Sequence, residues 1–294
     1  MASVQANGIT IEYEEQGSGE PLLLVMGLGG QLTDWPQEFV DLIADRGFRV
    51  IRLDNRDSGL STEFSGPPPT TWQITKTMLF RRPLPSEYVL DDMADDAVGL
   101  LSALDVDSAH VVGVSMGGMI AQTMAIRHPG RVRSLTSIMS TTGNRRVGQP
   151  KMRLITKFAR RKPPTLATAV DESIEMFREF CGPTFDEVEF REMARRSIER
   201  SFRPAGTGRQ TAAIMASGDR TEKLQRLHVP TLVVHGLLDP LVRPTGGIAT
   251  ADAVPGSRLL MFNDMAHDLP RTRWVEIADE ISLNAGRARS GVDA

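Results

Sequence analysis

The most constraining feature of this chain is the run Gly-Val-Ser-Met-Gly at residues 113–117. The residues before it, HVVGV, predict a buried strand, and the residues after it predict a helix that Pro129-Gly130 ends near residue 128. A serine between two glycines at such a junction has two interpretations. It is either a small residue in a tight turn or a nucleophile held exposed at the start of a helix.

Other uses of a glycine-rich turn between a strand and a helix do not fit this spacing. A dinucleotide-binding turn needs Gly-x-Gly-x-x-Gly, whereas Gly113 and Gly117 enclose Ser115 and two other residues. A phosphate-binding P-loop needs Gly-Lys-Ser/Thr, which neither this run nor the glycine-rich run at 27–30 contains. The run does match the nucleophile elbow Gly-x-Ser-x-Gly. We therefore predict that Ser115 is a catalytic nucleophile, with a purely structural turn as the alternative.

Strand and helix patterns alternate along most of the chain, which predicts an α/β fold. The stretch ITIEYEEQ (9–16) has the alternation of an antiparallel strand, and LLLVM (22–26) is apolar on both faces, as in a strand covered on both sides. Further strands are expected at 48–54, 110–114, 132–139, 231–236 and 257–262, with helices between most of them. This order favours a mostly parallel sheet covered by helices on both faces.

Two parts of the chain depart from this alternation. Residues 143–226 contain several amphipathic helical segments and no convincing strand, so we expect an inserted helical cap between core segments 1–142 and 227–294. Residues 63–87 contain five prolines, including Pro67, Pro68 and Pro69. We expect a loop with little regular structure there.

A catalytic serine needs a base and an acid that orients the base, and in this kind of fold they follow it in the order acid, then histidine. Asp239 comes just after the strand expected at 231–236, whereas the strand expected at 132–139 is followed by no carboxylate. Of the five histidines, His267 alone follows a well-placed acid. We predict His267 as the base and Asp239 as the acid, and we interpret Asp54 and Asp57 as loop or capping residues.

Ester or acyl chemistry at Ser115 also needs two backbone N–H groups for the oxyanion. One is expected from Met116, which follows the nucleophile. The other is expected from Leu28, in the loop after the strand at 22–26, where Met26, Gly27 and Gly29 would contact the substrate. A tight turn without a ligand is the alternative interpretation of this loop.

Composition excludes several other functions. The formal net charge is −3, which gives no bulk attraction to nucleic acid or anionic membranes. The single cysteine, Cys181, is expected to be a buried or half-buried structural thiol, and no metal-ligand cluster or cofactor site is expected. The N-terminus resembles no signal peptide and no apolar run is long enough to span a bilayer, so a cytoplasmic location is expected, with the oligomeric state left open.

Taken together, these motifs resemble the alpha/beta-hydrolase superfamily. The stretches VMGLGGQLTDWP, VIRLDNRDSGLST, VVGVSMGGMIAQ and MAHDLP look closest to its aclacinomycin methylesterase-like branch of esterases and lipases. The resemblance implies a triad of Ser115, His267 and Asp239, a helical cap at 143–226, and hydrolysis of carboxylic esters without a cofactor. The loop before the base departs from the family: it reads Asp-Met-Ala-His at 264–267, where Gly-x-Gly-His is usual.

Several functions remain open within this interpretation. The favoured one is hydrolysis of short to medium or hydrophobic acyl or methyl esters. The same triad could serve a lactonase, a thioesterase or a cofactor-free perhydrolase, and the same fold could act as a ligand receptor. A dehalogenase is disfavoured because that chemistry needs aspartate where Ser115 stands.

Overall fold

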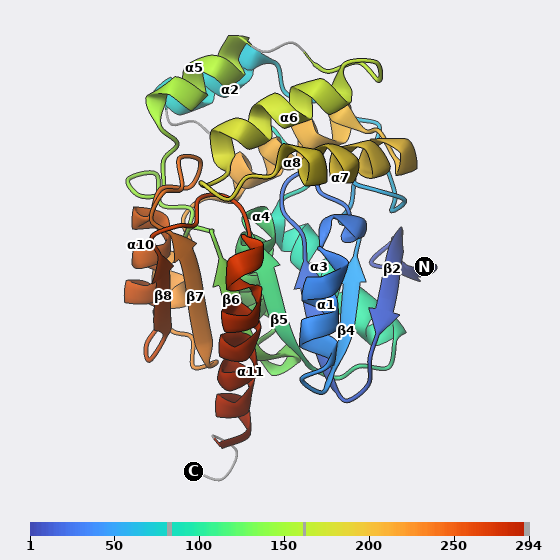
Figure 1. The fold of residues 1–294 in the computed structure, drawn as a ribbon, viewed down its shortest axis with the longest axis vertical. Helices are drawn as coiled ribbons and strands as arrows, with labels where there is room; N and C mark the ends of the chain where they lie inside the picture. The colour runs from blue at the N-terminus through green and yellow to red at the C-terminus, as the bar shows by residue number, and fades with distance from the viewer. Residues whose placement is uncertain (81–83, 161–162, 291–294) are drawn as a thin grey trace.

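The computed structural model describes residues 1–80, 84–160 and 163–290. Within these ranges the chain forms one eight-stranded sheet in the order β1-β2-β4-β3-β5-β6-β7-β8 (Figure 1). The strands are β1 (Ala2–Ala6), β2 (Ile9–Gln16), β3 (Glu20–Val25), β4 (Phe48–Leu53), β5 (Ala109–Val114), β6 (Val132–Ile138), β7 (Thr231–Gly236) and β8 (Arg258–Phe262). Strand β2 runs antiparallel to β1 and β4, and the other neighbours are parallel. The mostly parallel α/β sheet expected from the sequence is confirmed.

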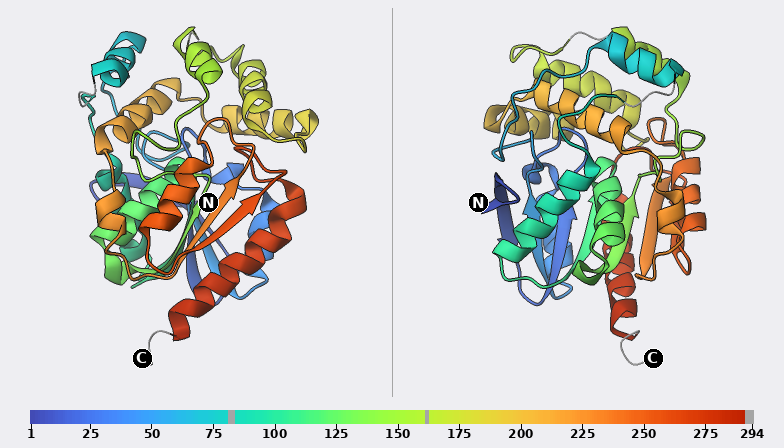
Figure 2. Two further views of the ribbon diagram at one scale, coloured as in Figure 1. Left: turned by 90° about the vertical axis from the view of Figure 1, so that its left-hand side faces the viewer. Right: turned by 180° about the vertical axis from the view of Figure 1, so that it is seen from behind.

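Helices cover both faces of this sheet (Figures 1 and 2). Helices α1 (Gln37–Ala44) and α11 (Trp274–Ser290) lie on one face, and α3 (Leu90–Ala103), α4 (Met116–Arg127), α9 (Thr221–Leu224) and α10 (Thr245–Ala253) lie on the other. Successive side chains of β3 point to opposite faces of the sheet, so this strand contributes to a hydrophobic core on each face. Leu22 and Leu24 pack in the core under α1 and α11, whereas Leu23 and Val25 pack in the core under α3 and α4.

A group of helices lies above the carboxyl ends of the parallel strands (Figure 1). We call it the helical layer: α2 (Thr71–Phe80), α5 (Met152–Arg160), α6 (Ala169–Phe180), α7 (Glu187–Arg200) and α8 (Pro204–Ser217). Helices α5 to α8 fall inside the block where amphipathic helices were expected. Among the residues described here, no helix is both long and apolar enough to cross a membrane.

Helix α2 was not expected, because residues 63–87 were interpreted as a loop with little regular structure. That expectation is wrong for Thr71–Phe80, a stretch that contains neither proline nor glycine. A capping box starts the helix: the backbone N–H of Thr70 donates to Gln73, and the Thr70 hydroxyl accepts from the backbone N–H of Gln73. The dense prolines around it concealed this local start signal.

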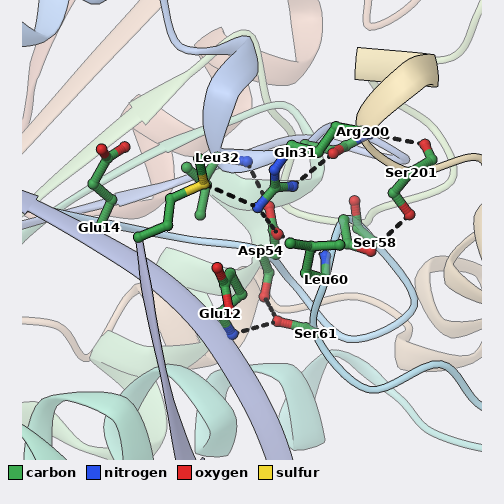
Figure 3. A network of polar contacts seen from close by, with 12 residues as sticks. Glu12, Glu14, Gln31, Leu32, Asp54, Ser58, Leu60, Ser61, Arg200 and Ser201 are labelled. Carbon is green, nitrogen blue, oxygen red and sulfur yellow. Dashed lines mark hydrogen bonds and ion pairs between the residues drawn. The ribbon is translucent and has the colours of Figure 1, made fainter. Parts of the chain in front are cut away.

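Two buried carboxylates in the loop after β4 fasten the helical layer to the sheet. Asp54 accepts hydrogen bonds from the backbone N–H groups of Leu32 and Leu60, and it pairs with Arg200 of α7 at 2.8 Å (Figure 3). Asp57 pairs with Arg209 of α8 at 2.7 Å. Both residues lie in a loop, as expected, but capping does not describe their role. Removing one partner of such a buried pair typically costs about 3–5 kcal/mol of stability.

Candidate active site

Ser115 lies in a sharp turn between β5 and α4. Its φ of 54° and ψ of −117° are unusual for a residue with a side chain, and such a conformation costs about 1–3 kcal/mol. The turn leaves no room for side chains on either side. A Cβ at Gly113 would lie 2.1 Å from the Gly117 carbonyl oxygen, and one at Gly117 would lie 2.0 Å from that of Val25. The two glycines therefore allow the serine to project from the tip of the turn.

The three predicted polar residues meet at the carboxyl edge of the sheet, although 152 positions separate Ser115 from His267. His267 Nε2 lies 3.0 Å from Ser115 Oγ, and His267 Nδ1 lies 2.7 Å from Asp239 Oδ2. When Nδ1–H donates to the carboxylate of Asp239, Nε2 of the neutral ring is left to accept the serine hydroxyl. This arrangement can remove a proton from Ser115.

Hydrogen bonds to the second carboxylate oxygen, Oδ1, fix the orientation of Asp239. Its Oδ1 accepts the backbone N–H groups of Leu241 and Val242 at 2.8 and 2.9 Å, so Oδ2 faces His267. A second, fully buried imidazole lies behind it: His235 Nε2 is 2.7 Å from the Val242 carbonyl oxygen and 3.5 Å from Asp239 Oδ2. Burial lowers the pKa of His235, which favours its neutral form. Nothing in the sequence assigned His235 a role, and its one signal is its position near the end of β7, four residues before Asp239.

The base loop, residues 264–268, holds His267 without the usual glycines. Met265 and Ala266 are buried, and the Met265 carbonyl accepts the backbone N–H of Leu238 at 3.1 Å. The backbone N–H of Ala266 donates to Asp268 at 2.9 Å, and that of His267 donates to the Phe180 carbonyl of α6 at 2.9 Å. These bonds compensate for the departure from the family pattern, because they support the loop on both sides of the histidine.

Cys181 follows α6 and is half-buried next to this loop. Burial raises the pKa of its thiol, and the carboxylate of Asp268 raises it further. Because the thiolate is the reactive form, both effects make Cys181 a poor nucleophile. The expected half-buried thiol agrees with this environment.

The 26–30 loop lies on the other side of Ser115. A Cβ built on Gly27 would lie 3.3 Å from Ser115 Cβ and 3.9 Å from Ser115 Oγ. The backbone N–H of Gly30 donates to the Gly27 carbonyl at 3.2 Å, and Gly29 has a φ of +70°. The side chain of Asn55 also donates to the Met26 carbonyl at 3.0 Å. This loop is a closed turn that touches the serine.

Two backbone N–H groups are available beside Ser115. Within the described ranges, the N–H groups of Leu28 and Met116 donate to no protein acceptor. Met116 is the first residue of α4, where the helix end favours negative charge. Among the described residues, no group of three or more His, Cys, Asp or Glu side chains is arranged to hold a metal ion. The site therefore brings together a hydroxyl, an imidazole hydrogen-bonded to a carboxylate, and two N–H groups without a protein acceptor.

Similarity to known proteins identifies the family of this chain. The model of the alpha/beta hydrolase fold family matches residues 20–270, so the chain belongs to this family. It is 29% identical over 275 residues to the rhodomycin D methylesterase DauP of Streptomyces sp. (strain C5), with 85% of each chain covered. It is 26% identical over 274 residues to the 2-hydroxymuconate semialdehyde hydrolase of Pseudomonas sp. (strain CF600), covering 92% of this chain and 87% of that one.

A solved structure has the same fold. The thermophilic esterase from Thermogutta terrifontis superimposes with a TM-score of 0.71 at 24% identity, covering 100% of both chains. The resemblance to the alpha/beta-hydrolase superfamily is thus confirmed, and relatives from its methylesterase branch are among the matches.

Proposed function

We propose that this protein hydrolyses carboxylic esters, with Ser115 as nucleophile, His267 as general base and Asp239 as the group that orients the base. The observation that carries the proposal is the chain of two hydrogen bonds from Ser115 through His267 to Asp239, at 3.0 and 2.7 Å. The methylesterase relatives support an ester as the substrate.

The reaction follows from the atoms that face one another. His267 Nε2 takes the proton from Ser115 Oγ as that oxygen attacks the ester carbonyl, and the tetrahedral intermediate forms. His267 then gives the proton to the departing alcohol, and an acyl group remains on Ser115. His267 Nε2 next takes a proton from the water that attacks the acyl-enzyme, and it returns this proton to Ser115 Oγ as the bond to the acyl group breaks and the carboxylic acid leaves. Asp239 keeps Nδ1 protonated and stabilises the positive ring.

The oxyanion of each tetrahedral intermediate binds to the backbone N–H groups of Leu28 and Met116. Both groups lack a protein acceptor within the described part of the chain, which supports this role. One such donor is typically worth about 3–4 kcal/mol of transition-state stabilisation. Met26, Gly27 and Gly29, which shape the 26–30 loop, are proposed to contact the substrate.

Helices α5 to α8 of the helical layer are proposed to form a cap over this site, whereas α2 belongs by sequence to the first core segment. In this division the core comprises residues 1–142 and 227–294, and the cap comprises residues 143–226. Two close approaches support this proposal. The Phe180 ring packs edge-on against His267, with ring centroids 6.3 Å apart. The Thr207 side chain lies so near Gly29 that a Cβ added to this glycine would be 2.9 Å from Thr207 Oγ1. The apolar ring of Phe180 beside His267 favours short to medium or hydrophobic acyl or methyl esters as substrates.

Turnover of p-nitrophenyl acetate, butyrate and octanoate by wild type and Ser115→Ala tests the proposal. We expect Ser115→Ala to lose activity by about 10⁴- to 10⁶-fold. Ser102→Ala is the matched control, because this exposed serine on α3 contacts Val98 and Arg131 and lies outside the site. Full turnover by folded Ser115→Ala would refute the proposal.

The same assay separates the related functions. Lactone and thioester substrates, and addition of peroxide with detection of a peracid, are run beside the esters. We expect esters to be turned over fastest. A faster lactone, thioester or peroxide reaction would replace the ester assignment, and binding with an acyl burst but no steady turnover would identify a receptor.

A further inference from the structure

We propose that Gln210 of α8 is a positioning residue that holds the 26–30 loop in the form that offers Leu28 N–H to the oxyanion. The proposal rests on the ester hydrolysis proposed above. It concerns a side chain of the helical layer that lies outside the triad and its oxyanion donors. Gln210 is fully buried, so its amide must satisfy its hydrogen bonds within the protein.

The amide of Gln210 bridges two backbone groups of different loops. Its Oε1 accepts the backbone N–H of Gly29 at 2.8 Å, and its Nε2 donates to the Arg56 carbonyl at 2.8 Å. The partners leave one orientation of the amide, because an N–H only donates and a carbonyl only accepts. Gln210 therefore connects the 26–30 loop to the loop after β4.

The hydrogen bond to Gly29 controls the form of the turn. The bond from Gly30 N–H to the Gly27 carbonyl closes residues 27–30, and the positive φ of Gly29 at the third position is that of a type II turn. Type I and type II turns differ in the direction of their central peptide, here the one that joins Leu28 to Gly29. Gly29 N–H belongs to that peptide, so its bond to Gln210 opposes the flip.

A flip of this peptide would change the ψ angle of Leu28 and the φ angle of Gly29. The N–H of Leu28 lies one peptide earlier, so loss of Gln210 acts on it by letting the whole 26–30 loop shift once its tie to the Arg56 carbonyl is gone. Oxyanion donors act through distance and angle, and a displacement of about 1 Å in a reacting geometry can cost on the order of 100-fold in rate. Losing Gln210 would also leave the Gly29 N–H and the Arg56 carbonyl without their partner.

Helix α8 is well placed to give this support. Arg209, the residue before Gln210, makes a two-pronged ion pair with the buried Asp57, with contacts of 2.8 and 2.7 Å. Tyr88 donates its hydroxyl to the same carboxylate at 2.6 Å. Gln210 therefore projects from a point fixed to the core. The helical layer is in this way part of the oxyanion site as well as its cover.

The test compares Gln210→Met with Ser217→Ala. Methionine has a similar length to glutamine but neither amide group. Ser217 lies on the same helix and accepts the Leu90 N–H at 2.9 Å, so its alanine variant removes a contact between α8 and the core far from the 26–30 loop. We measure kcat, KM and thermal stability, and the inhibition constant of a trifluoromethyl ketone, which forms a tetrahedral oxyanion on serine.

We expect Gln210→Met to lower kcat by about 10- to 100-fold, with KM changed less than about threefold. Affinity for the ketone should fall in parallel with kcat, and Ser217→Ala should keep both near wild type. Folded Gln210→Met with wild-type kcat and ketone affinity would overturn the proposal. Should Gln210→Met not fold, Gln210→Asn is measured instead, because its amide is one methylene too short to reach both partners.

The outcomes separate this proposal from the function on which it rests. An active Ser115→Ala would refute the triad mechanism itself. Inactive Ser115→Ala combined with unchanged Gln210→Met would leave ester hydrolysis intact and refute the role of Gln210 alone.

Discussion

The two loops that flank Ser115 are both supported by the helical layer, but through different kinds of atom. On the base side, the main-chain carbonyl of Phe180 accepts the N–H of His267 at 2.9 Å. On the oxyanion side, the side chain of Gln210 accepts the N–H of Gly29 at 2.8 Å. A main-chain contact survives most substitutions, whereas a side-chain contact is lost with one. The two sides should therefore respond differently to mutation.

Of the substitutions that compare the two sides, Asp239→Asn, on the side of His267, is expected to lower kcat most. The amide of asparagine can keep a hydrogen bond to His267 but favours the wrong tautomer and carries no charge to balance the imidazolium. We expect kcat for p-nitrophenyl esters to fall by about 10⁴-fold with the melting temperature little changed. A loss below about tenfold in folded enzyme would remove Asp239 from the mechanism.

A smaller loss of kcat is expected from a substitution where the main chain of the helical layer meets the base loop. A Cβ on Gly182 would lie 2.9 Å from the Asp264 carbonyl oxygen and 3.3 Å from the Ala266 nitrogen, so Gly182→Ala must shift one of the two segments. We expect kcat to fall by about tenfold, since the base moves with its loop. Gly130→Ala is the control, because a Cβ there has no neighbour within 4 Å. Equal activity of the two variants would contradict main-chain support of the base.

The smallest effect is a pH-dependent difference in stability on the oxyanion side. Asp34 accepts the Gln31 N–H at 2.9 Å, and the hydroxyl of Ser197 in α7 lies 3.4 Å from the same oxygen. Burial is the main cause that raises the pKa of Asp34 from 3.8 to about 6, with a smaller contribution from the charge of Asp54. The hydrogen bonds from Gln31 and Ser197 and the charge of Arg200 oppose this rise. Protonated Asp34 therefore favours the folded state below pH 3.8, and this contribution is lost as the pH rises through about 6.

The asparagine side chain in Asp34→Asn cannot ionise, so this variant should not lose stability as the pH rises through the pKa of Asp34. We expect the melting temperature of the variant, relative to wild type, to rise by roughly 2–4 °C between about pH 4.5 and about pH 7.5. Thermal unfolding of both proteins across this range measures the difference. A constant difference would show that Asp34 does not titrate within the folded site.

The sequence predicted the sheet and the three polar residues because their signals are local. A strand, a glycine-rich turn and a following helix predict Ser115 as the nucleophile. The order acid, then histidine, along the chain then selects Asp239 and His267 as its partners. Helix α2 was missed because prolines surround its capping box at Thr70.

Other parts of the site leave no local pattern in the sequence. Gly29 and Gln210 are 181 positions apart, and only the packing of α8 on the 26–30 loop brings them together. The pairing of Asp57 with Arg209 is equally remote, at 152 positions. Such contacts depend on how the helical layer is seated on the sheet, which neither periodicity nor spacing specifies.

A fluorophosphonate probe, which reacts with activated serines, tests whether Ser115 is the nucleophile that we propose. The wild-type protein is treated with the probe, digested, and mapped by mass spectrometry, with His267→Ala treated in parallel. We expect one adduct, on Ser115, that forms at a rate strongly reduced in His267→Ala. An adduct on another residue, or no adduct on folded wild-type protein, would contradict this role of Ser115.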